Sequence, residues 1–120
     1  MGFGGILGVT TYAARMEQHV AEGIIERCQE PRAVVASVIG AFPQAYGAEA
    51  AFALTAVAAG LESPVLEGQS DYFPQRQELY RCAALLAADI CAVEVLTQQR
   101  STCAAIRQYW DKSNEVFFQN

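Results

Sequence analysis

An almost uncharged stretch in the middle of the chain constrains the fold most. Residues 33–61 contain one charged side chain, Glu49, in twenty-nine positions, whereas the segments on both sides have the charge density of a solvated surface. A soluble monomer of this size leaves most of its residues in contact with water, so a helical pair with almost no charged face has to be covered. We therefore expect the rest of the fold, or a second copy of the chain, to cover residues 33–61.

The composition predicts an all-α domain that associates with itself. The 120 residues suffice for one hydrophobic core. Charged residues make up 18% of the chain, below the roughly 25% of typical soluble proteins, and oligomerisation would relieve the shortage of polar surface. Twenty-one alanines and the lack of a useful alternating apolar–polar segment indicate helices. We expect a self-associating four- to five-helix bundle that forms a single domain over residues 1–120.

Charge and hydropathy exclude two classes of partner. The net charge is −5 and the eight Lys and Arg residues never cluster, so nucleic-acid binding is not expected. Pro43 and Gln44 divide the apolar region into pieces shorter than the roughly twenty residues of a membrane span. The glycine-rich opening, residues 1–9, lacks the positive segment of a secretory signal, and we expect a flexible lead-in. Cytoplasmic localisation is the default expectation.

The cysteines favour a structural role over a metal site. Cys28, Cys82, Cys91 and Cys103 show no CxxC spacing and have apolar or alanine-rich neighbours, so we expect four buried, reduced thiols. A zinc site needs closely spaced ligand pairs, and His19 is the only histidine available to complete one. We therefore expect no metal and no cofactor.

Two helices are predicted before Pro43. The first begins near Thr10 or Thr11, whose hydroxyl can cap free amide groups, and runs to about Cys28. The second begins at Pro31 and runs to about Phe42, although this segment could also be a buried strand. The expected core positions of the two segments are Tyr12, Met16, Val20, Ile24 and Cys28, then Val34, Val35, Val38, Ile39 and Phe42.

A third helix is expected from after Pro43 to Ala59, with Gly60 as its C-cap. It has two apolar faces, and small residues four apart on one of them would let two helix axes approach closely. The close contact could lie within one chain or between two subunits. The large-residue face is Tyr46, Ala50, Leu54, Val57 and Leu61, and the small-residue face, our first candidate partner-binding site, is Gly47, Ala51, Thr55 and Ala59.

A long helix is predicted from about Phe73 to Thr97, after a connection over residues 62–72 that is the best loop for partner contacts. Pro74 is tolerated in the first turn of this helix, and its length would be about 38 Å. Its apolar stripe is expected to contain Leu79, Cys82, Ala83, Leu86, Ile90, Val93 and Leu96, while Arg76, Glu78, Arg81, Asp89 and Glu94 are expected to stay largely in water.

The last quarter of the chain offers a second candidate partner-binding site. The polar residues 98–102 predict either a break, with Ser101 capping a final helix, or a bend in one continuous helix. Residues 116–118 carry three large apolar side chains, which must dock on the chain's own bundle or on a second subunit. Aromatic residues dominate binding hot spots, so these side chains could anchor a partner or belong to the core. The candidates are Tyr109, Trp110, Phe117 and Phe118.

No catalytic constellation stands out. His19 lies near Glu22 and Glu26, but a di-iron bundle needs two histidine motifs and the chain has one histidine. We interpret His19 as a solvated or hydrogen-bonded side chain at a helix surface. No glycine-rich phosphate loop is present either.

The leading hypothesis is a small, non-enzymatic helical module that binds other proteins as an adaptor, regulator or assembly subunit and acts as a homo-oligomer. The alternative is a helical bundle that binds an apolar small molecule or pigment in a pocket lined by Phe42, Tyr46, Phe52 and the long helix. An enzyme is the third class.

Overall fold

The computed structural model of the chain describes residues 11–61 and 72–119. Within these ranges it is all-helical: α2 spans Tyr12–Ala21, the π-helical turn η1 spans Glu22–Glu26, α3 spans Pro31–Ala41, α4 spans Gly47–Gly60, α5 spans Phe73–Thr97 and α6 spans Cys103–Lys112. The predicted all-α bundle is confirmed, and the second segment is a helix, not a strand. The glycine-rich lead-in at 1–9, and the expected partner loop at 62–72 except its last residue, lie outside the described residues.

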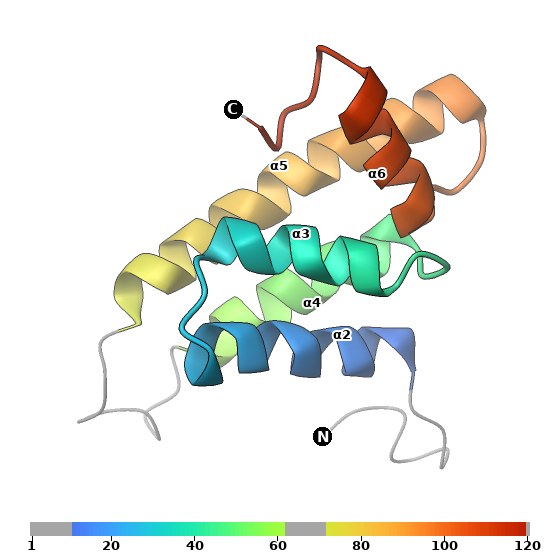
Figure 1. Ribbon diagram of the computed structural model, residues 1–120. Coiled ribbons are helices and arrows are strands. Elements are labelled where there is room, and N and C mark those ends of the chain that lie inside the picture. The colour runs from blue at the N-terminus through green and yellow to red at the C-terminus, as the bar shows by residue number, and fades with distance from the viewer. Residues whose placement is uncertain (1–10, 62–71, 120) are drawn as a thin grey trace.

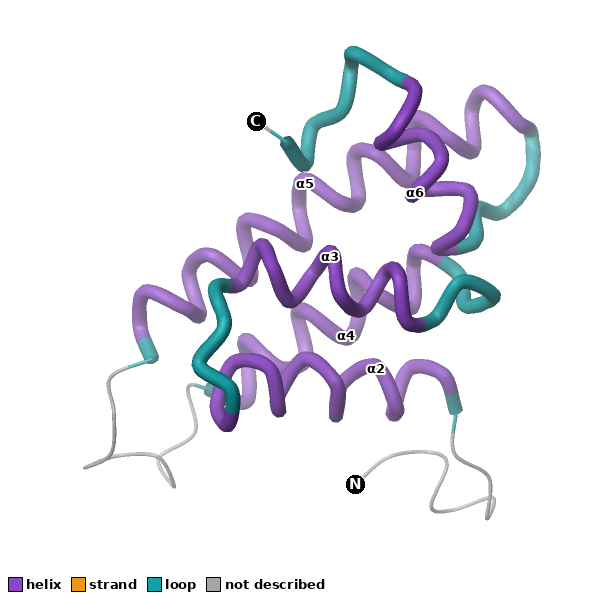
Figure 2. The backbone as a smooth tube through the Cα atoms, in the orientation of Figure 1, coloured by secondary structure: helices purple, strands orange, loops and turns teal. Residues whose placement is uncertain are grey.

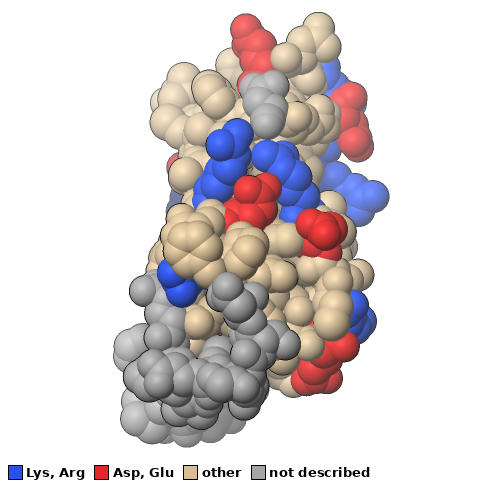
Figure 3. Space-filling model, turned by 90° about the vertical axis from the view of Figure 1, so that its left-hand side faces the viewer, with Lys and Arg blue, Asp and Glu red and all other residues tan. Residues whose placement is uncertain are grey.

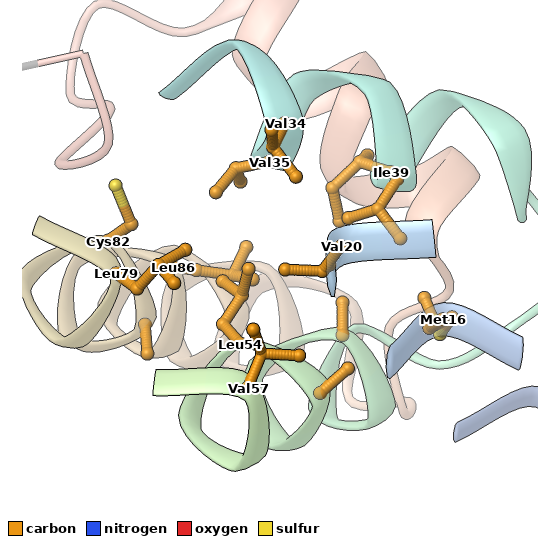
Figure 4. Close-up of a cluster of buried hydrophobic side chains, with 14 of the residues drawn as sticks. Met16, Val20, Val34, Val35, Ile39, Leu54, Val57, Leu79, Cys82 and Leu86 are labelled. Carbon is orange, nitrogen blue, oxygen red and sulfur yellow. The ribbon is translucent and has the colours of Figure 1, made fainter. Parts of the chain in front are cut away.

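The helices pack around one core. Figure 1 shows α2 and α3 running side by side in front of α4, while α5 passes behind α3 and carries α6 across its second half. Figure 2 shows the same path without a strand in the described residues. Helix α4 has its most extensive contacts with α5 and α2. Fully buried side chains from four helices meet between them (Figure 4), among them Met16, Val20, Ile39, Leu54, Leu79 and Leu86.

Local chemistry explains where the helices begin. Thr11 caps α2, because its Oγ1 accepts a hydrogen bond from the Ala14 amide at 3.1 Å. Pro31 occupies the first turn of α3, where an amide hydrogen would have no helical partner. At the start of α4, Glu49 Oε1 accepts from the Tyr46 amide at 3.0 Å. Two of these three signals, Thr11 and Pro31, were expected from the sequence.

Two connections that are far apart in the sequence pair with each other. The Gly47 amide donates to the Ser101 carbonyl at 2.8 Å, and the Cys103 amide donates to the Ala45 carbonyl at 2.7 Å. These bonds satisfy backbone groups that the helices cannot satisfy. They tie the connection between α3 and α4 to the connection between α5 and α6.

The prediction that all charged residues of the long helix stay in water is wrong at Asp89, which is completely buried. The prediction of four buried cysteines is also wrong for two of them. Cys28 and Cys91 are exposed, whereas Cys82 and Cys103 are buried. Cys28 comes after the last helical turn of η1, at a positive φ of 51°, and Cys91 lies on the outer side of α5.

The end of α5 differs from the prediction in detail. The helix breaks after Thr97, so the predicted break is correct and the alternative of one continuous, bent helix is not. Gln98 adopts the left-handed conformation at φ 60°. Ser101 does not cap α6, because its amide and hydroxyl both donate to Glu94 Oε2. Thr102 is the cap instead, and its Oγ1 accepts from the Ala105 amide at 3.2 Å.

Three smaller expectations fail at helix ends. Gly60 is the last residue of α4 and not its C-cap, which is Leu61. Tyr12 and Leu96 were expected in the core but are exposed. Both lie in terminal turns, where the neighbouring helices cover the side chains only in part.

The uncharged middle of the chain is covered on one side only. Val34, Val35, Val38 and Ile39 of α3 are buried, as are the expected core positions Ala50, Leu54 and Val57 of α4. The opposite side of each helix is exposed: Ala33, Ala36, Ser37 and Ala41 on α3, and Ala48, Phe52, Thr55 and Ala59 on α4.

Candidate interaction surface

Two helices that pack against each other, α4 and α5, each carry uncharged exposed residues on their outer sides, and we name these residues together the α4–α5 surface. On each helix the exposed positions recur every three or four residues on the side opposite the core, as the helical period requires. The surface consists of Ala48, Phe52, Thr55 and Ala59 of α4 and of Ala84, Ala87, Cys91 and Val95 of α5.

Two large side chains give this surface its apolar character. Phe52 is 56% exposed and Val95 is 64% exposed. Their neighbours in the surface are mostly alanines, which neither cover them nor add a hydrogen-bonding group. Single exposed apolar side chains are ordinary on protein surfaces, so the case for a contact surface depends on the uncharged residues around each of these two.

The predicted small-residue face of α4 is divided between the inside and the outside of the molecule. Gly47 is buried, and a Cβ atom at this position would lie 2.9 Å from Ile90 Cγ1. Ala51 is half-buried and packs against the core. Thr55 and Ala59 are exposed and belong to the α4–α5 surface. One end of the face therefore makes an internal contact, and the other end is free for an external one.

Three of the four aromatic candidates near the C-terminal end, Trp110, Phe117 and Phe118, donate a hydrogen bond to Asp89 from a side-chain or backbone N–H. Trp110 and Phe118 stack with ring centroids 4.8 Å apart, and the Trp110 Nε1 donates to Asp89 Oδ2 at 3.0 Å. The Tyr109 hydroxyl donates to the Glu115 carbonyl at 3.1 Å. Phe117 is 49% exposed. Residues 116–118 thus dock on the chain's own bundle.

Asp89 explains how this segment is held. Its Oδ1 accepts from the Phe117 amide at 2.8 Å, and its Oδ2 accepts from the Phe118 amide at 3.1 Å as well as from Trp110. Arg32 adds a hydrogen bond to the Phe118 carbonyl and places its guanidinium 5.4 Å from the Phe118 ring centroid. A buried carboxylate is tolerated here because three N–H groups surround it.

His19 makes a contact that superficially resembles part of a catalytic site. Its Nε2 lies 2.8 Å from Ser37 Oγ. Burial, and secondarily the charge of Arg27, lower the pKa of His19, while Glu22 opposes this shift. Ser37 is exposed in the middle of α3, where no helix N-terminus supplies the free amides of an oxyanion site. We assign this pair a surface role in joining α2 to α3.

The buried thiols are poor nucleophiles. Burial, reinforced by Glu78, raises the pKa of Cys82 to about 11, and burial with Glu49 raises the pKa of Cys103 to about 11. Both are therefore protonated at neutral pH. Within the described ranges, no three His, Cys, Asp or Glu side chains gather closely enough to hold a metal ion.

The aromatic residues of the predicted apolar pocket have separate neighbours. Phe42 packs edge-on against Tyr12 and His19 at centroid distances of 6.4 and 5.8 Å. The Arg100 guanidinium lies 3.7 Å from the Tyr46 ring centroid, and Phe52 faces outward. An apolar groove of about 420 Å³ lies elsewhere, between α5 and α6, and is lined by residues that include Val93, Leu96 and Tyr109.

A larger cleft of about 670 Å³ opens where the connection from η1 to α3 faces the first turns of α5. Figure 3 shows this end of the molecule, where acidic and basic side chains alternate and form no field of one sign. Sequence reasoning missed this cleft, because its walls come from residues 24–32 and 72–78, which only the fold brings together.

Over residues 11–61 and 72–119, no helix combines the length and the apolar character needed to cross a bilayer. Comparisons with protein-family models, with curated proteins and with solved structures found no match for this chain.

Proposed function

We propose that the protein is a small helical protein–protein interaction module that acts as a homo-oligomer through the α4–α5 surface. The observation that carries the proposal is the outer side of α4. There Phe52 is 56% exposed among Ala48, Thr55 and Ala59, without a charged side chain in the set. Covering such an apolar side with another surface removes it from water and so lowers the free energy of the protein.

A second copy of the chain is the partner that this surface fits best. The chain carries a net charge of −5, so two copies repel each other overall, and a contact through uncharged residues brings no like charges close together. The surface also combines one protruding ring with small neighbours. In a twofold contact, Phe52 of each copy would pack on Ala48, Thr55 and Ala59 of the other. Because each ring is only 56% exposed to begin with, its burial would contribute about 1–1.5 kcal/mol.

The substitution Phe52→Glu tests the proposal. We expect it to raise the dissociation constant of the oligomer at least about 100-fold, because each contact would bury unpaired carboxylates. Sedimentation equilibrium over a range of protein concentrations would measure this change.

Ile25→Glu is the matched control, because Ile25 is also an exposed large apolar residue, at 40%, but lies on η1. It should leave the association unchanged. Equal weakening by both variants, or no effect of Phe52→Glu on an oligomer that forms, would contradict the assignment of the surface.

We further propose that the protein is cytoplasmic. All four cysteines are unpaired thiols, which suits a compartment that keeps thiols reduced. Non-reducing electrophoresis of protein taken directly from cells tests this, because an interchain disulfide through Cys28 or Cys91 would argue against it.

A further inference from the structure

We infer that the cleft between the starts of α3 and α5 binds a small organic amine. This inference does not depend on the proposed self-association. The cleft has a volume of about 670 Å³, and small-molecule sites in proteins have volumes of about 300–1,000 Å³. It can therefore hold a ligand larger than a few waters.

Groups that accept hydrogen bonds dominate the polar part of the cleft. Glu30, Glu78 and Gln75 line it, and Arg32 is the cationic residue of its lining. The Arg32 guanidinium is already used by the protein, because its Nε donates to Glu78 Oε2 at 3.0 Å and its Nη1 donates to the Phe118 carbonyl. Within the described residues, Glu30 takes part in no ion pair. The lining thus carries two carboxylates against one guanidinium, and this excess of one negative charge favours a cation within the cleft.

Gln75 provides an independent reason to expect a hydrogen-bond donor. Its Oε1 is the buried side-chain polar atom of the described residues that has no hydrogen-bond partner. A buried acceptor without a donor is unfavourable and is rare in folded proteins. Gln75 is one of the residues that line the cleft, and the terminal torsion of a glutamine is soft, so its amide can adapt to a ligand bound there. An ammonium group has three donors and could meet Gln75, Glu30 and Glu78 together.

An anion fits the cleft less well, although helices α3 and α5 both begin there. Free amides at helix starts attract anions, but Pro31 and Pro74 each remove an amide hydrogen from the first turn of these helices. The carboxylates of Glu30 and Glu78 would also repel a phosphate. These two observations favour an amine over an anion.

The remaining lining indicates an amine with an apolar body. Ile24, Tyr72 and the two prolines line the cleft next to the acceptors. Phenethylamine, which joins a primary ammonium to an aromatic ring, is therefore a suitable probe. Its neutral analogue 2-phenylethanol has nearly the same shape without the charge.

Cys28 allows the site to be located directly. It is an exposed thiol that lines the cleft, whereas the exposed Cys91 lies on the outer side of α5 and outside the cleft. We expect phenethylamine at about 5 mM to slow the alkylation of Cys28 by iodoacetamide at pH 7 about sixfold, as a dissociation constant of about 1 mM would give. The rate at Cys91, followed in the same sample by mass spectrometry, should not change.

Variants separate the roles of the acceptors. Glu30→Gln and Gln75→Met should each remove the protection of Cys28, while Glu26→Gln, at an exposed position outside the cleft, should keep it. Gln75→Met should also raise the melting temperature of the ligand-free protein, because it removes an unsatisfied acceptor. This combination of greater stability and weaker binding is the signature of a residue kept for a ligand.

Several results would overturn the inference. They are an absence of protection at Cys28, equal protection by 2-phenylethanol or by inorganic phosphate, equal slowing at Cys91, and a lower melting temperature for Gln75→Met. The measurement on the unmodified protein is decisive even if a variant folds poorly.

Discussion

At the scale of single residues, Asp89 shows best how the fold overrides a sequence pattern. An aspartate in a long helix is typically solvated, yet both carboxylate oxygens of Asp89 accept hydrogen bonds from groups that lie 21 to 29 residues away. The three apolar side chains at 116–118 indicated that this segment must dock on another part of the chain or on a second subunit. The sequence could not show that backbone amides of this segment would meet a particular carboxylate.

The substitution Asp89→Asn should lower the free energy of unfolding by about 2–4 kcal/mol, because charge-assisted hydrogen bonds are lost and an amide NH₂ then faces a backbone N–H. Urea unfolding would measure the loss. The emission of Trp110, the only tryptophan, should shift to longer wavelength as its contacts with Asp89 and Phe118 loosen. Asp111→Asn, at an exposed position of α6, is the control and should change stability by less than about 0.5 kcal/mol.

His19 should make stability depend on pH. Its pKa is lowered in the folded protein, first by burial and then by Arg27, so the unfolded chain, with a pKa of about 6.5, binds the proton more readily. The stabilisation from neutral His19 is present above pH 6.5 and is lost as the pH falls through the folded pKa. Melting temperatures at about pH 5.5 and 7.5 should differ less in His19→Gln than in the unmodified protein. An equal difference in both proteins would argue against this role.

At the scale of elements, the close approach of α4 to its neighbours depends on Gly47. A side chain there would collide with Ile106 and Ile90. Gly47→Ala should therefore destabilise the protein by about 1–3 kcal/mol, despite the better helix propensity of alanine. Gly60→Ala is the control, because nothing lies within 4 Å of a Cβ at that position. It should stabilise α4 slightly in urea unfolding, and similar gains for both variants would refute the predicted collision.

Local signals predicted some helix bounds well and others poorly. Helix α5 spans Phe73–Thr97 as expected, because Pro74 and the polar residues after Thr97 mark its two ends. The cap of α6 was misplaced by one residue, since Ser101 and Thr102 both carry hydroxyls and only the position of Glu94 decides their roles. Cys91 has apolar neighbours in sequence and Cys28 continues the four-residue apolar spacing of the first helix, but neither pattern determines which side of a helix the core covers.

At the scale of the whole molecule, the uncharged middle of the chain predicted that α3 and α4 would be covered. The other helices cover one side of each and leave an outer side of small residues, which on α4 also includes Phe52. The small-residue pattern on α4 indicated a close helix contact. The helical period alone could not predict that one end of this face is buried and the other end is exposed. The candidate surface on α5 was not predicted, because its alanines carry no signal without the burial of the opposite side.

Static light scattering of the purified, unmodified chain between about 5 and 200 µM, a range that includes the dissociation constants of weak dimers, tests the central claim most directly. We predict a mass of at least twice the chain mass of 13.0 kDa at the upper end of this range. A mass of 13.0 kDa at every concentration would contradict self-association through the α4–α5 surface.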